Sequence, residues 1–333
     1  MSKIRVVSFG LGPIGVRAAW LAHQRKGIEL VGAIDIDPKK TGKDLGEFFA
    51  PATKTGITIE ADADAAFDRL KPDAVLHCTS SFMPVVKDQL VAIASRGIDI
   101  ISSTEELLLP DLQHPDIAKV VDAAALAGGA TVLGTGVNPG FAMDFIAIVA
   151  SAVTYSVRRV RCVRVVDAGT RRLPLQKKVG AGLTAAEFEA QKQTGRFGHI
   201  GMRESVGLLA RGLGFEVDEI TQTLEPVLAT EQRKTPFLTV QSGQVAGIRN
   251  IGRGTRKGEV LIELDLSMFV GAPSPRDQIH IEGEPSVDLV FQGGIAGDTA
   301  TAAILVNSIA QVVAASPGLK TVLDIAPPRG VVG

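Results

Sequence analysis

A glycine-rich turn near the amino end constrains the fold more than any other feature of the chain. The apolar run Ile4–Phe9, typical of a buried strand, leads directly into Gly10, Gly12 and Gly15, and a helix is expected over Pro13–Arg25. Glycines at the spacing G-x-G-x-x-G allow a tight turn, a close approach of backbone to a pyrophosphate, and close packing of helix on strand. The free N–H groups at the start of the helix then favour phosphate binding.

An acidic residue after the next expected strand supports a dinucleotide-binding (Rossmann) unit. The run Glu29–Ile34 ends in Asp35, which follows Gly15 by about the ~20 residues typical of the carboxylate that binds the ribose diol of NAD. Asp35 should repel the extra phosphate of NADP, although Lys39 and Lys40 lie close enough in sequence to soften that repulsion. The alternative for the glycine motif is a glycine-rich turn in another kind of α/β protein. The alternative for the two lysines is an ordinary solvated surface.

Composition excludes several classes of protein. The chain has 333 residues, enough for two domains, and a formal net charge of −1, which gives no basic patch for nucleic acid or an anionic membrane. Its two cysteines form no disulfide framework, and its five histidines lack the paired spacing of a zinc site, so we expect no metal. No apolar run reaches the ~18 residues of a membrane span, and no signal peptide is recognisable, so we expect a cytoplasmic protein.

The first 140 residues alternate between strand and helix patterns. This alternation predicts a doubly wound parallel sheet, with a dinucleotide-binding domain over residues 1–140. The further expected strands span residues 57–60, 73–78, 99–103 and 131–137, and the further helices span 62–70, 115–126 and a segment that begins near Met83.

Small polar residues follow the strand expected over 73–78. Ligands bind beyond the carboxyl ends of strands in such sheets, so Cys78, Thr79 and Ser80 should line the cofactor site. The same residues also suit a turn that caps the helix near Met83. We do not expect Cys78 to be a nucleophile, because no base lies near it in sequence.

Two adjacent carboxylates follow the strand expected over 99–103. Thr104, Glu105 and Glu106 come at the end of that strand, on the side where the cofactor should lie. The alternative is that the two glutamates cap a turn or face solvent. A glycine- and proline-rich segment, residues 134–141, then predicts the hinge between two domains and the floor of the active site.

The pattern changes after the helix expected over 141–154. Strand-like runs cover residues 157–166, 217–227, 237–248, 259–269 and 279–291, without long helices between the later ones. They predict an α+β domain over 141–294 with a mostly antiparallel sheet. The run of Arg158, Arg159, Arg161 and Arg164 suggests one basic face of a strand, turned to solvent or to another subunit. Residues 295–333 should form an apolar helix and a tail that return to the first domain.

Seven short motifs, in order, resemble those of the native NAD(P)-dependent amine dehydrogenases and the related 2,4-diaminopentanoate dehydrogenases. They cover nearly the whole chain and read GLGPIG, STEEL, GTGVNPGF, DAGTRR, GHIGMRES, GGIAGDTATAA and LDIAPPRG. That family shares a two-domain plan with dihydrodipicolinate reductase. The chain lacks the paired-histidine helix and the K-x-D-A-P-S-G-T segment of the reductase, which counts against that activity.

The resemblance implies reversible reductive amination of a carbonyl compound with ammonia, an NAD or NADP cofactor, and a homodimer. The active-site glutamate of the family would correspond to Glu105 or Glu106 of STEEL, and inspection leaves both open. Chemically, one carboxylate near the cofactor could take a proton from the substrate ammonium as general base, and then stabilise the iminium charge.

The sequence therefore proposes two sets of further residues. Cofactor-binding candidates are Gly10, Gly12, Pro13, Ile14, Gly15, Asp35, Lys39, Cys78, Thr79, Ser80, Thr104 and Asn138. Substrate-pocket candidates are Asn138, Pro139, Phe141, Met143, Leu175 and His199.

The scarcity of charge in these motifs favours a small ketone or aldehyde as the carbonyl substrate. An inward-pointing Arg171 or Arg172 would instead favour a carboxylate-bearing substrate such as a diamino acid. The alternative functions are 2,4-diaminopentanoate dehydrogenase itself, a dihydrodipicolinate reductase-like imine reductase, and a non-catalytic nucleotide sensor.

Overall fold

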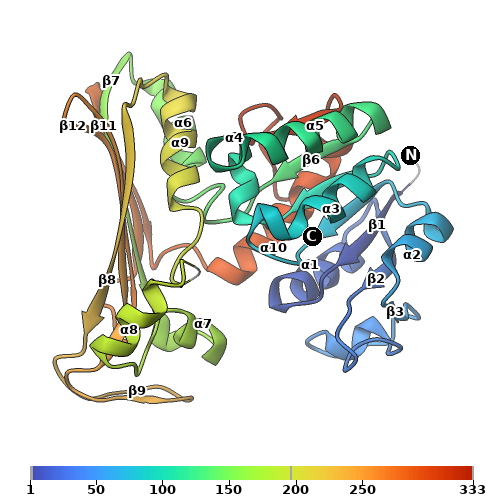
Figure 1. The fold of residues 1–333 in the computed structure, drawn as a ribbon, viewed down its shortest axis with the longest axis horizontal. Helices are drawn as coiled ribbons and strands as arrows, with labels where there is room; N and C mark the ends of the chain where they lie inside the picture. The colour runs from blue at the N-terminus through green and yellow to red at the C-terminus, as the bar shows by residue number, and fades with distance from the viewer. Residues whose placement is uncertain (1–2, 196, 332–333) are drawn as a thin grey trace. The chain divides into compact units, whose positions relative to one another are not determined.

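A computed structural model describes residues 3–195 and 197–331 of the chain, which divides into two compact units (Figure 1). The first unit comprises residues 1–140 and 296–333, and the second comprises residues 141–295. Within the described ranges, no helix combines the length and the hydropathy that a membrane span requires.

The first unit is built on a seven-stranded sheet in the order β15-β6-β5-β4-β1-β2-β3, and every neighbouring pair is parallel. This confirms the predicted Rossmann sheet. The central strands are short apolar runs with side chains buried on both faces, as parallel strands require. Their bounds are β1 Ile4–Phe9, β2 Ile28–Ile34, β3 Ile59–Glu60, β4 Ala74–His77, β5 Asp99–Ser102, β6 Thr131–Gly134 and β15 Gly318–Lys320.

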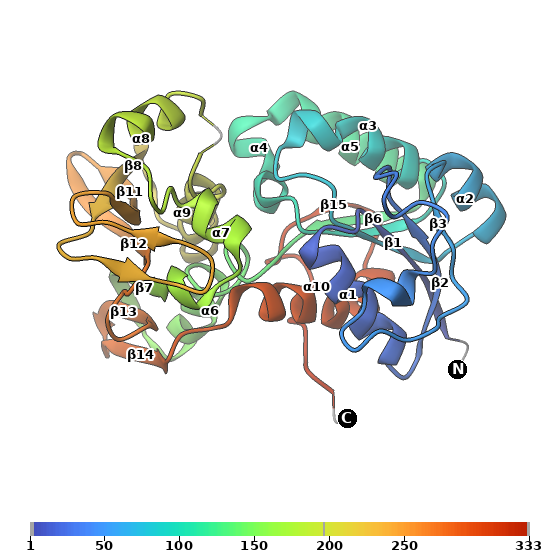
Figure 2. The ribbon, with the colours of Figure 1, turned by 90° about the horizontal axis from the view of Figure 1, so that it is seen from below.

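Helices cover both faces of this sheet (Figure 2). One face packs against α1 (Pro13–Gln24) and α10 (Gly297–Val313), which also contact each other. The other face packs against α2 (Ala63–Leu70), α3 (Met83–Ala94) and α5 (Pro115–Gly128) around a core of Leu, Ile, Val and Phe side chains. Short helical turns η1 (Leu45–Phe48), η2 (Glu105–Leu108) and α4 (Pro110–Gln113) lie in the connections.

The strand order reverses between β1 and β4, because the chain builds outward first to β3 and then returns to the other side of β1. In such sheets, the carboxyl ends of the two strands at this reversal diverge and leave room for a ligand. The glycine turn follows β1 and residues 78–81 follow β4, so both lie at the reversal. Strand β15 was not predicted, since three residues give no readable pattern.

The second unit contains a six-stranded mixed sheet in the order β14-β13-β7-β12-β11-β8. Its pairs are antiparallel except β7 with β12. This confirms the predicted α+β fold with a mostly antiparallel sheet. The strands are β7 Ser156–Asp167, β8 Glu219–Leu228, β11 Val245–Arg256, β12 Glu259–Phe269, β13 Arg276–Glu284 and β14 Val287–Gln292, and a separate hairpin pairs β9 (Arg233–Lys234) with β10 (Thr239–Val240).

Two of the expected strands were wrong in extent. The run 237–248 is interrupted by a turn in which Gln244 N–H donates to the Gln241 carbonyl, with Gly243 at φ +82°. The run 279–291 is two strands, β13 and β14, joined by a turn at Pro285. In both cases a polar turn divides the run into separate segments.

Helices of the second unit cover one face of its sheet (Figure 1). Apolar residues of α6 and α9 pack on the even-numbered residues of β12, such as Ile262 and Leu264. The opposite face carries ion pairs, for example Arg161 with Glu263. The helical segments are α6 Phe145–Ala150, η3 Ser151–Val153, η4 Ala168–Thr170, α7 Leu173–Lys178, α8 Ala185–Lys192 and α9 Met202–Leu213.

The prediction that the four arginines of β7 share one face was wrong for Arg164. Successive side chains of a strand point to opposite faces, and Arg161 and Arg164 are three positions apart. Arg161 therefore points outward and Arg164 points inward. Arg164 is 3% exposed and forms an ion pair with Asp277 at 2.6 Å. It also donates to the Ile295 carbonyl, while Ile295 N–H donates to Asp277.

Candidate active site

The glycine turn after β1 has the geometry of a phosphate cradle. Gly10 has φ +86°, and a Cβ there would lie 2.6 Å from the Cys78 carbonyl oxygen. A Cβ at Gly15 would lie 1.8 Å from the Gly10 carbonyl oxygen, so α1 can pack on β1 only with glycine there. A Cβ at Gly12 would meet no atom within 4 Å, so the backbone at the start of α1 faces open space.

The open start of α1 fits a pyrophosphate. Gly12 caps the helix without a side-chain hydrogen bond, and Pro13 occupies its first turn. The first turn of a helix leaves N–H groups without intrahelical acceptors, and here those of Ile14 and Gly15 lie in that turn. An anionic group at this position would be stabilised by these N–H groups and by the helix dipole.

Asp35, at the end of β2, is held as a carboxylate. Its oxygens accept the N–H groups of Leu11 at 2.7 Å and Asp37 at 2.8 Å, and the Lys40 ammonium at 2.9 Å. Burial alone would raise the pKa of Asp35, but the Asp37 N–H, Lys40 and the Leu11 N–H together lower it. The Leu11 contact also ties Asp35 to the glycine turn.

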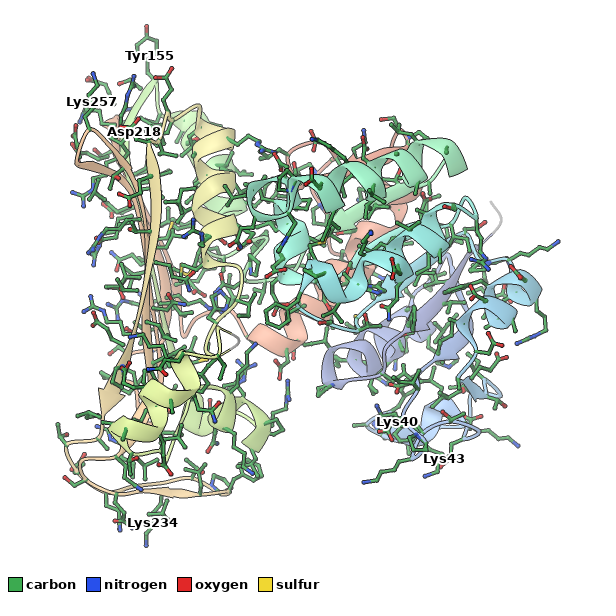
Figure 3. All side chains as sticks on the ribbon, in the orientation of Figure 1. Lys40, Lys43, Tyr155, Asp218, Lys234 and Lys257 are labelled. Carbon is green, nitrogen blue, oxygen red and sulfur yellow. The ribbon has the colours of Figure 1, made fainter. Side chains whose placement is uncertain are left out.

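Lys40, rather than Lys39, is the lysine that contacts Asp35. The Lys40 Nζ is 2.9 Å from Asp35 and 3.6 Å from Asp37, on the loop after β2 (Figure 3). Lys39 is exposed, and its backbone N–H donates to the Asp37 carboxylate. Sequence spacing could not separate two adjacent lysines, because only the turn at residues 37–40 decides which one folds back.

The residues after β4 are built into the sheet edge. Burial raises the pKa of the Cys78 thiol to about 11, a contact with Ser103 opposes this, and the nearby charge of Glu105 adds to it. Cys78 is therefore a neutral thiol at physiological pH, as expected for a residue that is not a nucleophile. The Ser80 hydroxyl accepts the Phe82 N–H at 3.3 Å, in the turn immediately before α3.

The Glu106 carboxylate is held by contacts within the protein. Its Oε2 accepts the N–H of Met83, the first residue of α3, at 2.7 Å, and lies 3.0 Å from the His114 Nε2. Its side chain is 12% exposed. A carboxylate at a helix N-terminus satisfies a free N–H and interacts favourably with the helix dipole. Glu106 thus connects η2, α3 and the segment before α5.

Glu105 has no such partner. In residues 3–195 and 197–331, its carboxylate makes no hydrogen bond and no ion pair, although its charge acts on Cys78 at the end of β4. Its side chain is half-buried at the start of η2. The two glutamates that sequence inspection left open therefore differ: one is engaged in a cap, and the other is available.

The segment after β6 is packed by its glycines. A Cβ at Gly134 would lie 2.4 Å from the Leu107 backbone, so η2 can pack against β6 only because residue 134 is a glycine. Gly140 has φ +119°, and the peptide bond between Asn138 and Pro139 is cis. The Val137 N–H donates to the Thr301 hydroxyl of α10 at 3.2 Å. Asn138 is half-buried and Pro139 is buried.

The other substrate-pocket candidates lie in the second unit and do not form one cluster there. Met143 is 1% exposed and belongs to the core that α6 and α9 share with the sheet. Leu175, on α7, packs against a separate core that includes Phe188. Phe141 is half-buried, and its carbonyl accepts the Ile146 N–H at the start of α6.

His199 precedes α9 in a positively charged environment. Burial, followed by the charges of Lys178 and Arg164, lowers the pKa of His199 to about 3, so the ring is neutral. Its Nε2 is shielded from solvent and has no protein partner among the described residues. Arg171 lies close enough to affect Arg164 electrostatically, and its carbonyl accepts the Gln176 amide. Arg172 is the N-cap residue of α7, and its side chain is not used for capping.

Sequence reasoning missed a network of polar residues in the first unit. His77, Gln89 and Ser102 join Thr79 and Thr104 in one hydrogen-bonded network at the carboxyl ends of β4 and β5. A histidine and a serine inside apolar strands were the only available hints, since buried polar residues require partners.

Comparison with known proteins now identifies the family. Residues 141–333 match the family model described as the 2,4-diaminopentanoate dehydrogenase C-terminal domain. The chain is 32% identical to the 2,4-diaminopentanoate dehydrogenase of Acetoanaerobium sticklandii, over 100% of this chain and 96% of that protein. The chain belongs to the 2,4-diaminopentanoate dehydrogenase family.

Two amine dehydrogenases are similar over the same length. The amine dehydrogenase of Streptomyces virginiae is 27% identical, over 99% of this chain and 98% of that protein. The structure of the amine dehydrogenase from Mycobacterium smegmatis superposes with a TM-score of 0.87 at 28% identity, covering 99% of this chain and 98% of that one. Family membership makes this chain an oxidoreductase acting on amine donors, and it confirms the resemblance carried by the seven motifs.

The different contacts of the two glutamates predict different effects on stability. Glu106→Ala leaves the Met83 N–H and His114 without their acceptor, so it should cost about 1–2 kcal/mol. Thermal unfolding should show a melting temperature lower by a few degrees. Glu105→Ala is the matched control and should leave it unchanged. Equal losses in the two variants would contradict the assignment of the cap to Glu106.

Proposed function

We propose that this enzyme is an NAD(P)-dependent amine dehydrogenase that interconverts an amine with a carbonyl compound and ammonia, with Glu105 as its catalytic carboxylate. The observation that carries the assignment is the contrast within the STEEL motif. Glu106 is engaged by Met83 and His114, whereas the Glu105 carboxylate, at the carboxyl end of β5, has no hydrogen bond or ion pair with any described residue. Ligands of such sheets bind at this edge.

The cofactor site that we propose uses residues of the first unit. The N–H groups of Ile14 and Gly15 would hold the pyrophosphate, and Asp35 would accept the ribose hydroxyls. Thr79, Ser80 and Thr104, at the ends of β4 and β5, would lie along the nicotinamide half. When bound, the nicotinamide supplies the hydride acceptor or donor of the reaction.

The proposed role of Glu105 follows from the charge of the substrate. An aliphatic ammonium cannot release hydride from its carbon until it loses a proton, because the nitrogen lone pair must form the C=N bond. Glu105 takes that proton as general base and then stabilises the iminium charge. In the reverse direction, its protonated form donates to the departing water of the carbinolamine. Asn138 could orient the substrate nitrogen or carbonyl.

For the substrate, we favour a small ketone or aldehyde, with a carboxylate-bearing amine as the second candidate. The second candidate is supported by the cationic surroundings of His199, where Lys178 and Arg164 both act on the ring. Arg164 is paired with Asp277, so Lys178 is the other cation whose charge acts on the ring.

The experiment that tests the proposed function is oxidation of NADH and NADPH with a panel of short ketones, aldehydes and amino ketones with and without a carboxylate. Each is assayed with and without ammonium at alkaline pH. Turnover that requires ammonium supports the proposal. Reduction of a cyclic imine with no gain from ammonium would indicate an imine reductase, and tight cofactor binding without turnover would indicate a sensor.

Substitution of Glu105 tests its role directly. Glu105→Gln keeps the shape of the side chain but cannot accept the proton, so kcat should fall by about 10²–10⁴-fold. The dissociation constant for NADH, measured by fluorescence, should stay unchanged. Glu219→Gln, at the exposed start of β8, is the matched control and should retain full turnover. Near-normal kcat in the Glu105 variant would overturn the assignment.

The contact of Lys40 with Asp35 makes a prediction about cofactor choice. We propose that NAD is the preferred cofactor and that NADP is accepted because Lys40 can leave Asp35 to neutralise the 2′-phosphate. Lys40→Ala should therefore weaken NADPH binding by about tenfold or more, and leave NADH binding unchanged. Lys39→Ala, at the exposed neighbouring position, should change neither constant. An equal effect of the two substitutions would refute this role for Lys40.

We also propose a cytoplasmic homodimer, as the resemblance implies. The two free cysteines favour a reducing compartment. The outer face of the sheet in the second unit, where Arg161 and Arg253 pair with Glu263, is the surface that we expect the second copy to cover. Light scattering should give a mass twice the 34.9 kDa of one chain. A mass of one chain at micromolar concentration would exclude the dimer.

A further inference from the structure

A buried hydrogen-bond network links the two loops that carry the proposed site. Its centre is His77, the last residue of β4, which is 0% exposed. The His77 Nδ1 is 2.9 Å from the Ser102 hydroxyl, and its Nε2 is 2.9 Å from the Gln89 amide and 3.0 Å from the Thr79 hydroxyl. The rings of Phe9 and His77 pack edge to face, with their centroids 5.6 Å apart.

The donor of each hydrogen bond on the Nδ1 side of His77 can be assigned by starting from the Ser80 carbonyl, where the chain of contacts ends. The Ser80 carbonyl has no hydrogen, so the Thr104 hydroxyl must donate to it, at 2.8 Å. The contact of 2.9 Å between the Ser102 and Thr104 hydroxyls must then be donated by Ser102. Ser102 has only one hydrogen, so the Nδ1 of His77 must carry a hydrogen and donate it to the Ser102 oxygen.

At Nε2, on the other side of the ring, the hydrogen count allows two states: Nε2 with a hydrogen or Nε2 without one. If Nε2 also carries a hydrogen, His77 is a cation without solvent and without a carboxylate among its contacts. Burial lowers the pKa of His77 to about 4, although the hydrogen bond with Gln89 opposes the shift, so the neutral ring is favoured. Nε2 is then an acceptor.

A neutral ring fixes the orientation of the Gln89 amide. The amide atom that faces Nε2 also lies 2.7 Å from the Thr79 hydroxyl oxygen. Its NH₂ group can donate one hydrogen to each, whereas its oxygen could donate to neither. Oxygen and nitrogen exchange places by rotation of the amide, and the hydrogen count selects nitrogen. The Thr79 hydroxyl, 3.0 Å from Nε2, is then a second donor to that nitrogen.

We propose that His77 is a positioning residue, held as the neutral Nδ1–H tautomer, whose one-way chain through Ser102 and Thr104 to Ser80 sets the position of Glu105. Thr104 immediately precedes Glu105, and the Glu106 N–H donates to the Ser81 carbonyl at 3.2 Å. The loop after β5 is therefore tied to the loop after β4 on both sides of Glu105. The functional part of this proposal rests on the proposed role of Glu105.

The tautomer is tested by NMR of the full-length protein labelled with ¹⁵N-histidine. The chain has only five histidines, and loss of one set of signals in His77→Phe assigns His77. We expect an Nδ1–H signal and a ring that does not titrate between pH 8 and about pH 5, as a pKa of about 4 requires. An Nε2–H tautomer, or titration near the ordinary ~6.5 of histidine, would overturn the proposal.

The positioning role is tested by Ser102→Ala, which interrupts the chain. We expect kcat to fall by about 10- to 100-fold, with the NADH dissociation constant unchanged. Ser95→Ala, at an exposed serine after α3, is the matched control. Full kcat in Ser102→Ala would contradict the role.

If Ser102→Ala fails to fold, Gln89→Glu serves as the second variant. A carboxylate cannot donate to Nε2, so His77 should take up a second proton and give the NMR shifts of an imidazolium. An unchanged tautomer in that variant would contradict the hydrogen count. The NMR result does not depend on turnover, so it stands or falls separately from the role of Glu105.

Discussion

The structure of the candidate site depends on one carboxylate at a helix N-terminus. Glu106 accepts the first N–H of α3 and pairs with His114, which fixes the loop after β5 against the loop after β4. Without this contact, the start of α3 would carry a free N–H at the sheet edge where the ligand is expected. Because Glu106 is used in this way, we propose the adjacent Glu105 as the catalytic carboxylate.

Asp35 and Glu105, two acidic residues of the first unit, have different electrostatic surroundings. Asp35 is kept ionised by two backbone N–H groups and Lys40, as a group that accepts hydrogen bonds from a ribose must be. Glu105 forms no ion pair within residues 3–195 and 197–331, and its charge acts on the protonated Cys78. His77 is kept neutral by burial, because an imidazolium there would carry its charge away from solvent.

Sequence patterns predicted the parallel sheet, the glycine turn and Asp35, since each rests on a local rule: apolar runs, G-x-G-x-x-G and a fixed spacing. They also narrowed the catalytic candidates to two neighbouring glutamates. They could not choose between these, because the choice depends on Met83 and His114, which lie 23 and 8 residues away in the chain. The same reason hid Gln89 and the inward turn of Arg164, whose partners come from other elements, whereas the choice of Lys40 over Lys39 depends on the turn at residues 37–40.

The most direct test of this account is a crystal structure of the enzyme with a nicotinamide dinucleotide and a small amine bound. The account predicts the Glu105 carboxylate within hydrogen-bond distance of the amine nitrogen, with Glu106 still accepting the Met83 N–H. A complex in which Glu105 extends into bulk solvent, while another carboxylate contacts the amine, would contradict it.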